Sequence, residues 1–246
     1  MIALYGAPQS PRLGDLGVGT PDQASARLVR QAAPYRAGGK PVLPALWLVA
    51  TIAHSRPGLD GFYRERQSPA TIRRYLAAAR KANALLVLDV QPGRADLMGE
   101  VRALLAFLRQ PDVGLAIDPQ WAVGPDQVPA AALGRLDAAQ VNRVSALIAA
   151  EIRRRDLPQK LLVVHQFAPE LISGRERLRS RPGVALVIDV NATGSAAEKA
   201  DLYAKLAPAA AGIFAGVNLF YRDDDELMTP AEILRLRPQP DVVVYE

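Results

Sequence analysis

Short apolar runs alternate with amphipathic stretches along the whole chain. The runs predict strands over residues 2–5, 42–52, 85–90, 113–117, 161–164, 185–190, 212–219 and 242–245. Most of them are uninterrupted by polar residues, which is typical of parallel strands covered on both faces. The stretches between them predict helices over residues 22–33, 69–82, 94–109, 137–155, 196–206 and 230–235.

Several of these helices carry start signals in the sequence. Thr20, Ser68 and Thr229 each precede a proline, so each can cap a helix whose first residue is that proline. Asp137 or Leu136 opens the helix that runs to residue 155. The capping residues therefore support the helix boundaries that the apolar periodicity suggests.

Eight strands that alternate with helices predict an α/β fold, a (β/α)8 TIM barrel that forms a single domain over residues 1–246. No helix is predicted after the eighth strand, so either the expected barrel lacks its final helix or the chain is trimmed there. An open, doubly wound sheet is the alternative, and the lack of a glycine-rich loop after the first strand disfavours it. The loops at 7–20, 54–68 and 119–136 are long, which places the working face at the carboxyl ends of the strands.

Polar and aromatic residues follow nearly every predicted strand. Side chains two apart on a strand share a face, so Asp89 points the same way as Gln91, and Asp189 the same way as Asn191. We therefore expect one mouth at which these side chains converge. The candidate catalytic residues are Asp89, Asp118, His165 and Asp189, and the candidate substrate-binding residues are Tyr5, Gln91, Gln120, Trp121, Gln166, Asn191, Asn218, Tyr221 and Tyr245.

The composition narrows the chemistry that this mouth can perform. The sequence has no cysteine and two histidines, His54 and His165. Disulfide scaffolds, thiol nucleophiles, thiolate zinc clusters and multi-histidine metal sites are therefore excluded. Aspartate, amide side chains and one strand-end histidine remain to perform any reaction.

The charge pattern gives little support for an extended anionic partner. The net charge is +5, and arginines cluster at 73–74, 153–155 and 175–181, within or just after predicted helices. No aromatic residues are interleaved with them, so we expect solvated helix faces and no nucleic-acid partner. No apolar run reaches the ~18–20 residues that a membrane span needs, and we expect no membrane span.

Carboxylates flanked by amides, tyrosines and a tryptophan suit carbohydrate hydrolysis. One carboxylic acid protonates the leaving oxygen, a carboxylate attacks or activates water, and aromatic rings stack on the sugar. Asp118 is the candidate acid, because Pro119 and Trp121 would reduce its hydration and raise its pKa. Asp89 or Asp189 would be its partner, and His165 would orient a carboxylate or bond a sugar hydroxyl. This mechanism needs no metal or cofactor.

Other interpretations of the same residues stay open. Asp118, His165 and Asp189 could hold a divalent ion in a hydrolase or isomerase. The barrel could also bind glycan or cell-wall polysaccharide without catalysis. A phosphate-handling barrel is disfavoured, because the acidic run at 223–226 follows the seventh strand, where such barrels bind phosphate; that run is most simply a solvated loop. Individually, a strand-end aspartate can cap a helix, His165 can be structural, and Trp121 can belong to the core.

Three motifs in the chain resemble known sequences. With Asp118 at the end of its fourth strand, the eight-strand pattern looks like a glycoside-hydrolase barrel. The segments LDVQPGR at 88–94, VGLAIDPQW at 113–121 and LLVVHQF at 161–167 are similar to those of a group of secreted bacterial proteins of unassigned activity. This resemblance covers roughly residues 84–246. It implies a barrel fold and an extracellular or cell-envelope location, and it implies no particular reaction.

The sequence also departs from two well-known glycosidase patterns. The large retaining clan has glutamates on the fourth and seventh strands, where this chain has Asp118 and Asn218. The spaced acids of chitinase-like barrels, which end in a glutamate, are missing as well. No signal-peptide pattern precedes the first predicted strand, which fits a cytoplasmic protein and equally the mature part of a secreted one.

Overall fold

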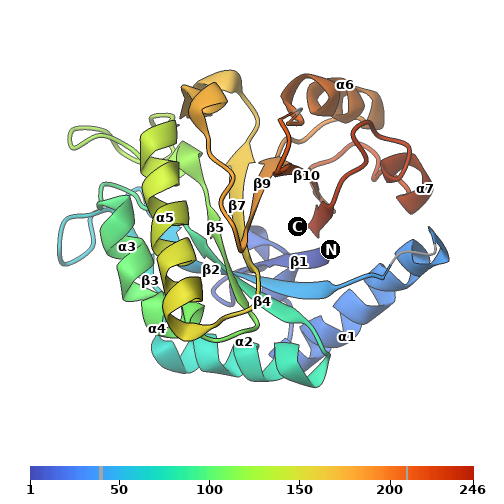
Figure 1. Ribbon diagram of the computed structural model, residues 1–246, viewed down its shortest axis with the longest axis horizontal. Helices are drawn as coiled ribbons and strands as arrows, with labels where there is room; N and C mark the ends of the chain where they lie inside the picture. Colours follow the sequence, from blue (N-terminus) through green and yellow to red (C-terminus); the bar gives the residue numbers. More distant parts are fainter. Residues whose placement is uncertain (39–40, 209) are drawn as a thin grey trace.

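The computed structural model describes residues 1–38, 41–208 and 210–246, and its centre is a closed barrel of eight parallel strands (Figure 1). Strand β1 pairs with both β2 and β11, which closes the barrel and confirms the predicted fold over an open sheet. In order round the barrel the strands are β1 (Ile2–Gly6), β2 (Pro44–Ala53), β4 (Leu85–Val90), β5 (Val113–Ile117), β7 (Lys160–Gln166), β9 (Val184–Val190), β10 (Ile213–Leu219) and β11 (Val242–Tyr245).

Helices surround these strands, as Figure 1 shows. They are α1 (Pro21–Ala32), α2 (Pro69–Lys81), α3 (Leu97–Ala103), α4 (Leu105–Leu108), α5 (Ala138–Arg155), α6 (Ala196–Leu206) and α7 (Pro230–Ile233). The expected capping residues Thr20, Ser68, Asp137 and Thr229 each accept a hydrogen bond from a backbone N–H in the first turn. Local capping chemistry therefore sets these helix starts as predicted.

Two parts of the helical prediction are corrected. The helix expected over 94–109 begins at Leu97, because the Asp96 side chain caps Gly99, and it is interrupted at Leu104. The arginines at 175–181 do not belong to an α-helix. In the described segment between β7 and β9 the chain forms 3₁₀ turns at Pro169–Leu171 and Arg175–Arg177 and the short strand β8 (Ile172–Ser173), which pairs with β6 (Leu136–Asp137).

The core has an inner and an outer layer, set by the alternation of side chains along the strands. Inside the barrel lie small residues such as Ala3, Ala45 and Ala116, together with valines and the large ring of Trp47. The outer layer packs the opposite strand faces against the helices and includes Leu4, among many aliphatic side chains. Alternate residues of each strand therefore point into the barrel, and the position of a polar residue along its strand decides whether its side chain lies inside.

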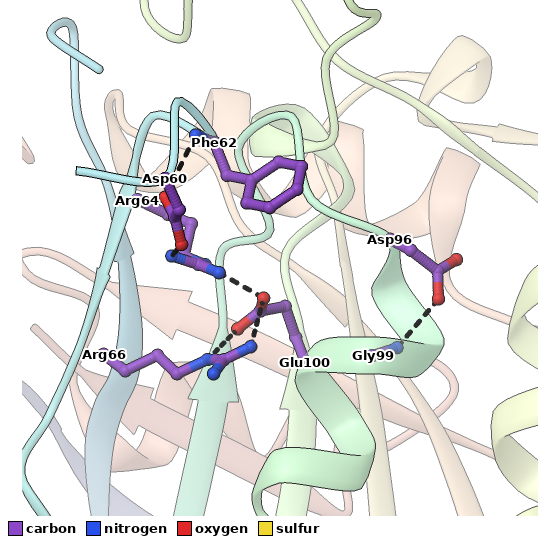
Figure 2. Close-up of polar contacts among 7 residues, drawn as sticks. All are labelled: Asp60, Phe62, Arg64, Arg66, Asp96, Gly99 and Glu100. Atoms are coloured by element: carbon purple, nitrogen blue, oxygen red, sulfur yellow. Dashed lines mark hydrogen bonds and ion pairs between the residues drawn. The ribbon is translucent and has the colours of Figure 1, made fainter. Parts of the chain in front are cut away.

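The loop after β2 is held against α3 by a buried ion cluster (Figure 2). It includes the short strand β3 (Arg64–Arg66), which pairs antiparallel with β2. Glu100 of α3 accepts hydrogen bonds from Nε of Arg64 at 2.9 Å and from Nε of Arg66 at 2.7 Å. The Arg64 guanidinium also donates to Asp60 at 2.6 Å. This cluster fixes one side of the barrel's carboxyl-end face.

Candidate active site

Three of the predicted catalytic residues meet inside the barrel. Asp89, His165 and Asp189 lie one step beyond the inner apolar layer on β4, β7 and β9. His165 and Asp189 are directly opposite in the register of β7 and β9. All three side chains are buried, so the barrel interior encloses charged groups above its apolar layer.

The imidazole of His165 bridges the two aspartates. Its Nε2 lies 3.1 Å from Oδ2 of Asp89, and its Nδ1 lies 2.9 Å from Oδ2 of Asp189. The indole N–H of Trp47 donates to the same Asp89 oxygen at 3.0 Å. Nδ2 of Asn191 lies 3.2 Å from Nδ1 of His165. The ring is thus fixed in position from both sides.

This environment keeps His165 protonated. Burial by itself lowers the pKa of the imidazole, but the charge of Asp89 and the hydrogen bonds that both aspartates accept from the ring outweigh it and raise the pKa well above its usual value. A protonated ring can donate an N–H to each carboxylate at once. Asp89, His165 and Asp189 together have one positive and two negative groups, so they place a net negative charge inside the barrel, below the carboxyl ends of the strands.

A glycine makes room for one of these carboxylates. A Cβ added at Gly216 of β10 would lie 2.5 Å from Oδ1 of Asp189. That oxygen and Oδ1 of Asp89 have no hydrogen-bond partner among the described residues. The small residue at this strand position therefore determines where the Asp189 carboxylate can lie.

Replacing Gly216 by alanine is expected to displace Asp189 and to weaken its hydrogen bond to His165. Overpacking of this kind typically lowers the free energy of unfolding by about 1–3 kcal/mol. The matched control is Gly99→Ala in α3, where the new Cβ would lie at an ordinary 3.6 Å from Asp96 and alanine favours the helix. Urea denaturation of both variants tests this, and equal unfolding midpoints would contradict it.

A cavity of about 570 Å³ opens above the trio at the carboxyl ends of the strands. Two carboxyl groups line it, Asp118 after β5 and Glu246 after β11. Amide and aromatic side chains form much of the remaining wall. The lining residues are Tyr5, Arg12, Leu13, Val49, Gln91, Asp118, Gln120, Trp121, Phe167, Asn191, Ala192, Thr193, Phe220 and Glu246.

Asp118 is buried and does not cap the 3₁₀ turn that follows it. Its Oδ2 accepts a hydrogen bond from the Gln120 amide at 3.0 Å. Burial raises the pKa of Asp118 to about 6, and the Asp89 charge adds to this, while the His165 charge opposes it. The pKa of Asp118 is raised because loss of hydration disfavours the ionised form, whereas the Trp121 side chain, which was expected to raise the pKa, lowers it.

Glu246 is held in the barrel by its backbone and by one amide. Its N–H donates to the Leu219 carbonyl at 2.8 Å, and its own carbonyl accepts from Tyr221 at 2.8 Å. The Asn218 amide donates to Oε2 at 3.0 Å. Burial raises the pKa of Glu246 to about 8; the Asp118 charge adds to the rise, and the His165 charge opposes it. Near neutral pH one cavity carboxyl is therefore mostly ionised and the other mostly protonated.

Tyr5 and Gln91 form the wall between β1 and β4. The Gln91 amide donates to the Tyr5 hydroxyl at 3.4 Å, and its carbonyl accepts from the Ala53 backbone at 3.0 Å. Burial and the neighbouring carboxylates raise the pKa of Tyr5 well above its usual value. Tyr5 is therefore a neutral phenol that can bond a bound hydroxyl group.

Two predicted binding tyrosines do not line this cavity: Tyr245 faces away from the barrel interior, and Tyr221 lines a smaller cavity that shares Arg12 and Glu246 with it. Tyr245 points out of the barrel, where its hydroxyl lies 2.6 Å from that of Tyr35. Tyr221 stacks on Tyr245, with ring centroids 5.6 Å apart, and its hydroxyl donates to Gln31. Neighbouring residues of a strand face opposite sides, so Tyr245 and Glu246 cannot both point inward.

Gln166 and Asn218 support the site without lining the cavity. Gln166 follows His165 directly and therefore faces the other way, donating to the Ala168 carbonyl at 3.1 Å. Asn218 lies inside the barrel and positions Glu246. Of the predicted binding residues, the structure brings Tyr5, Gln91, Gln120, Trp121 and Asn191 to the cavity.

The sequence-based prediction missed Glu246 and Trp47 as parts of this site. The signal for Glu246 was its spacing of two and four residues from Val244 and Val242, which line the barrel interior, because residues two apart on a strand share a face. Trp47 stands within the apolar run of the second strand, so nothing local distinguishes it from the core. Its role is visible only through its hydrogen bond to Asp89.

The acidic run at 223–226 contains a second feature that the prediction missed. Asp224 is not a solvated loop residue: its buried carboxylate accepts two hydrogen bonds of 2.8 Å from the buried ammonium of Lys199. Lys199 also donates to the Ala192 carbonyl at 2.6 Å. This pair joins the loops after β9 and β10, which present Thr193 and Phe220 to the cavity.

The residues proposed for a metal site do not fit one. Both ring nitrogens of His165 are occupied by Asp89 and Asp189, which leaves neither to bind an ion. Within residues 1–38, 41–208 and 210–246, no three histidine, aspartate or glutamate side chains are grouped as metal ligands. Asp118, His165 and Asp189 therefore do not fit a shared metal ion.

The comparisons with known proteins do not identify a family. The sequence matches no protein-family model, and it matches no curated protein. Among the described residues, no helix is both long and apolar enough to cross a membrane. The geometry and electrostatics of the cavity are therefore the basis for the function proposed below.

Proposed function

We propose that the protein is a carbohydrate-active barrel that hydrolyses a glycosidic bond of a poly- or oligosaccharide in the 570 Å³ cavity. The observation that supports this most is the pair of carboxyl groups lining it, with a pKa of about 6 at Asp118 and about 8 at Glu246. Glycoside hydrolysis uses one protonated and one ionised carboxyl group at the same pH.

The two carboxyl groups would divide the reaction between them. Glu246, protonated near neutral pH, would donate its proton to the leaving glycosidic oxygen. Asp118, ionised at the same pH, would attack the anomeric carbon or remove a proton from the attacking water. This refines the sequence hypothesis, in which Asp118 was the acid and Asp89 or Asp189 its partner.

Asp89, His165 and Asp189 would act as positioning residues below the substrate. The buried imidazolium of His165 lowers the pKa of both Asp118 and Glu246, so its loss would shift both values upward. Trp121, Phe167 and Phe220 supply aromatic surface for sugar rings, and the cavity amides can bond hydroxyl groups. An extracellular or cell-envelope location also remains a proposal, supported by the sequence resemblance.

A non-catalytic glycan-binding barrel is the second candidate. The same aromatic and amide lining favours it, because such a wall binds sugar whether or not the carboxyl groups react. The two candidates differ only in turnover. In both, the occupant of the cavity is a glycan.

A polysaccharide screen separates these candidates. The purified protein is incubated with a panel of neutral and acidic glycans, and released reducing ends are measured beside direct binding. Release that is lost in Asp118→Asn supports hydrolysis. Binding by both proteins without release supports the binding barrel, and neither binding nor release contradicts a carbohydrate function.

A further inference from the structure

Arg12 is the one basic side chain among the described residues that line the candidate active-site cavity. It also lines a neighbouring cavity of about 350 Å³, whose wall includes Tyr221, Arg222, Asp223 and Asp15, the last of which is paired with Arg27. Glu246 is the other residue that the two cavities share. The proposed proton donor and Arg12 therefore both contribute to the wall of each cavity.

The charge of Arg12 is not neutralised within the described part of the chain. Its exposed guanidinium makes no hydrogen bond or ion pair there, and its backbone N–H donates to the Ser10 hydroxyl at 3.1 Å. The neighbouring arginines are engaged differently. Arg27 pairs with Asp15 at 2.9 Å, and Arg222 donates to the Pro11 carbonyl. Arg12 is thus available to a ligand.

The loop that presents Arg12 is packed tightly against β1. A Cβ added at Gly14 would lie 2.5 Å from the Tyr5 carbonyl oxygen, and Gly14 has a φ of +101° that favours glycine. Arg222 holds the same loop through Pro11. The backbone under Arg12 is therefore fixed before any ligand binds, which lowers the entropic cost of binding.

We propose that the two cavities together bind one acidic oligosaccharide, and that Arg12 pairs with an anionic group of the sugar next to Glu246. This inference rests on the proposed carbohydrate function and names its substrate class. A guanidinium suits a carboxylate or sulfate because it donates two parallel N–H groups. It also offsets the repulsion between such a ligand and ionised Asp118.

The test compares matched acidic and neutral ligands. Binding of oligogalacturonides, the same oligomers after carboxyl reduction, and a sulfated neutral oligosaccharide is measured by calorimetry. Wild type is expected to bind an acidic probe about tenfold or more tightly than the reduced one. Arg12→Gln is expected to lose about that factor for the acidic probe alone, in line with a charged hydrogen bond of about 1.4 kcal/mol or more. The charge-matched control Arg56→Gln, in the loop after β2 and outside both cavities, is expected to behave as wild type.

The outcomes distinguish this inference from the function on which it rests. Preference for the uronate probe or for the sulfated probe supports the inference and identifies the anionic group. Equal wild-type affinity for acidic and neutral probes overturns the inference. It is also overturned if Arg12→Gln loses the same affinity for acidic and neutral probes, or if Arg56→Gln loses as much affinity for the acidic probe as Arg12→Gln does. Asp118-dependent hydrolysis of neutral glycans that is indifferent to Arg12 leaves the proposed function standing and rejects the acidic substrate. If acidic probes bind in an Arg12-dependent way without turnover, the acidic ligand class is supported and only the hydrolytic reaction is rejected.

Discussion

Replacing Asp118 by asparagine is expected to lower the turnover of a glycan substrate by about 10²–10⁴-fold, the usual contribution of a positioned acid–base group. Asparagine has nearly the same shape and can still bond Gln120, so the fold and the binding of substrate are expected to persist. Reducing-end release and calorimetry on the same samples separate these effects. The control is Glu226→Gln, which removes an exposed carboxylate outside the cavity.

The pH dependence of the wild type follows from the same two groups. Below a pH of about 6 Asp118 becomes protonated and can no longer attack or act as a base. Above a pH of about 8 Glu246 ionises and can no longer donate a proton. Activity is therefore expected to follow a bell-shaped curve with its maximum between these values.

Glu246→Gln gives a sharper test of the division of roles. It is expected to lose activity on natural glycans but to keep much of it on aryl glycosides, whose leaving groups depart without a proton donor. Asp118→Asn is expected to be inactive on both substrates. If Asp118→Asn hydrolyses glycans at the wild-type rate, or if the pH curve lacks both limbs, the assignment of these carboxyl groups is wrong.

Replacing Glu100 by alanine is expected to lower the free energy of unfolding by about 3–5 kcal/mol, as loss of one partner of a buried ion cluster does. The Glu100 side chain is 2% exposed and that of Arg64 is 9% exposed, so the Arg64 guanidinium in Figure 2 loses a carboxylate that water cannot fully replace, whereas the Arg66 side chain is 45% exposed. Urea denaturation with a constant m-value measures the loss.

The neighbouring strand residue Glu65 provides the matched control for Glu100. Its side chain is 69% exposed, and its ion pair is a 3.5 Å contact with His54. Glu65→Ala is expected to change the free energy of unfolding by at most about 1 kcal/mol. Similar losses in the two variants would show that burial of the Glu100 cluster does not stabilise the protein.

The Glu100 cluster also affects the cavity indirectly. The Phe62 carbonyl in the same loop accepts a hydrogen bond of 2.8 Å from the Arg94 backbone. Arg94 follows the turn that Gln91 begins, and Gln91 lines the cavity. Glu100→Ala is therefore expected to increase hydrogen exchange in this loop as well as to destabilise the fold.

Much of the fold could be predicted from local sequence. Residues 85–90, 113–117 and 242–245 were predicted with the bounds that the structure has. The first residues of the capped helices could also be predicted, because a capping residue and the first helical turn are only a few positions apart in the sequence. The break at Leu104 was missed, because apolar periodicity continues through it. The expectation that the arginines at 175–181 lie within or just after a helix was wrong.

The site could be predicted only in part. Strand parity placed Asp89 with Gln91 and Asp189 with Asn191, and the structure has each pair on one face. The same parity excludes Tyr245 from the interior and includes Glu246, but a four-residue strand gives a weak local signal for its inward face. Lys199 could not be linked to Asp224 from sequence, because the two belong to different loop–helix units.

By itself, the sequence determined the eight strands, their alternation with helices along the chain, and the position of acidic residues at the carboxyl ends of the strands. These depend on side-chain periodicity and capping, which act within a few residues. Only the tertiary structure decided that Asp89 and Asp189 bind His165 while Asp118 and Glu246 line the cavity. Closure of the barrel and the register of its strands bring these residues together from opposite ends of the chain, and burial among one another's charges then sets the pKa of each cavity carboxyl.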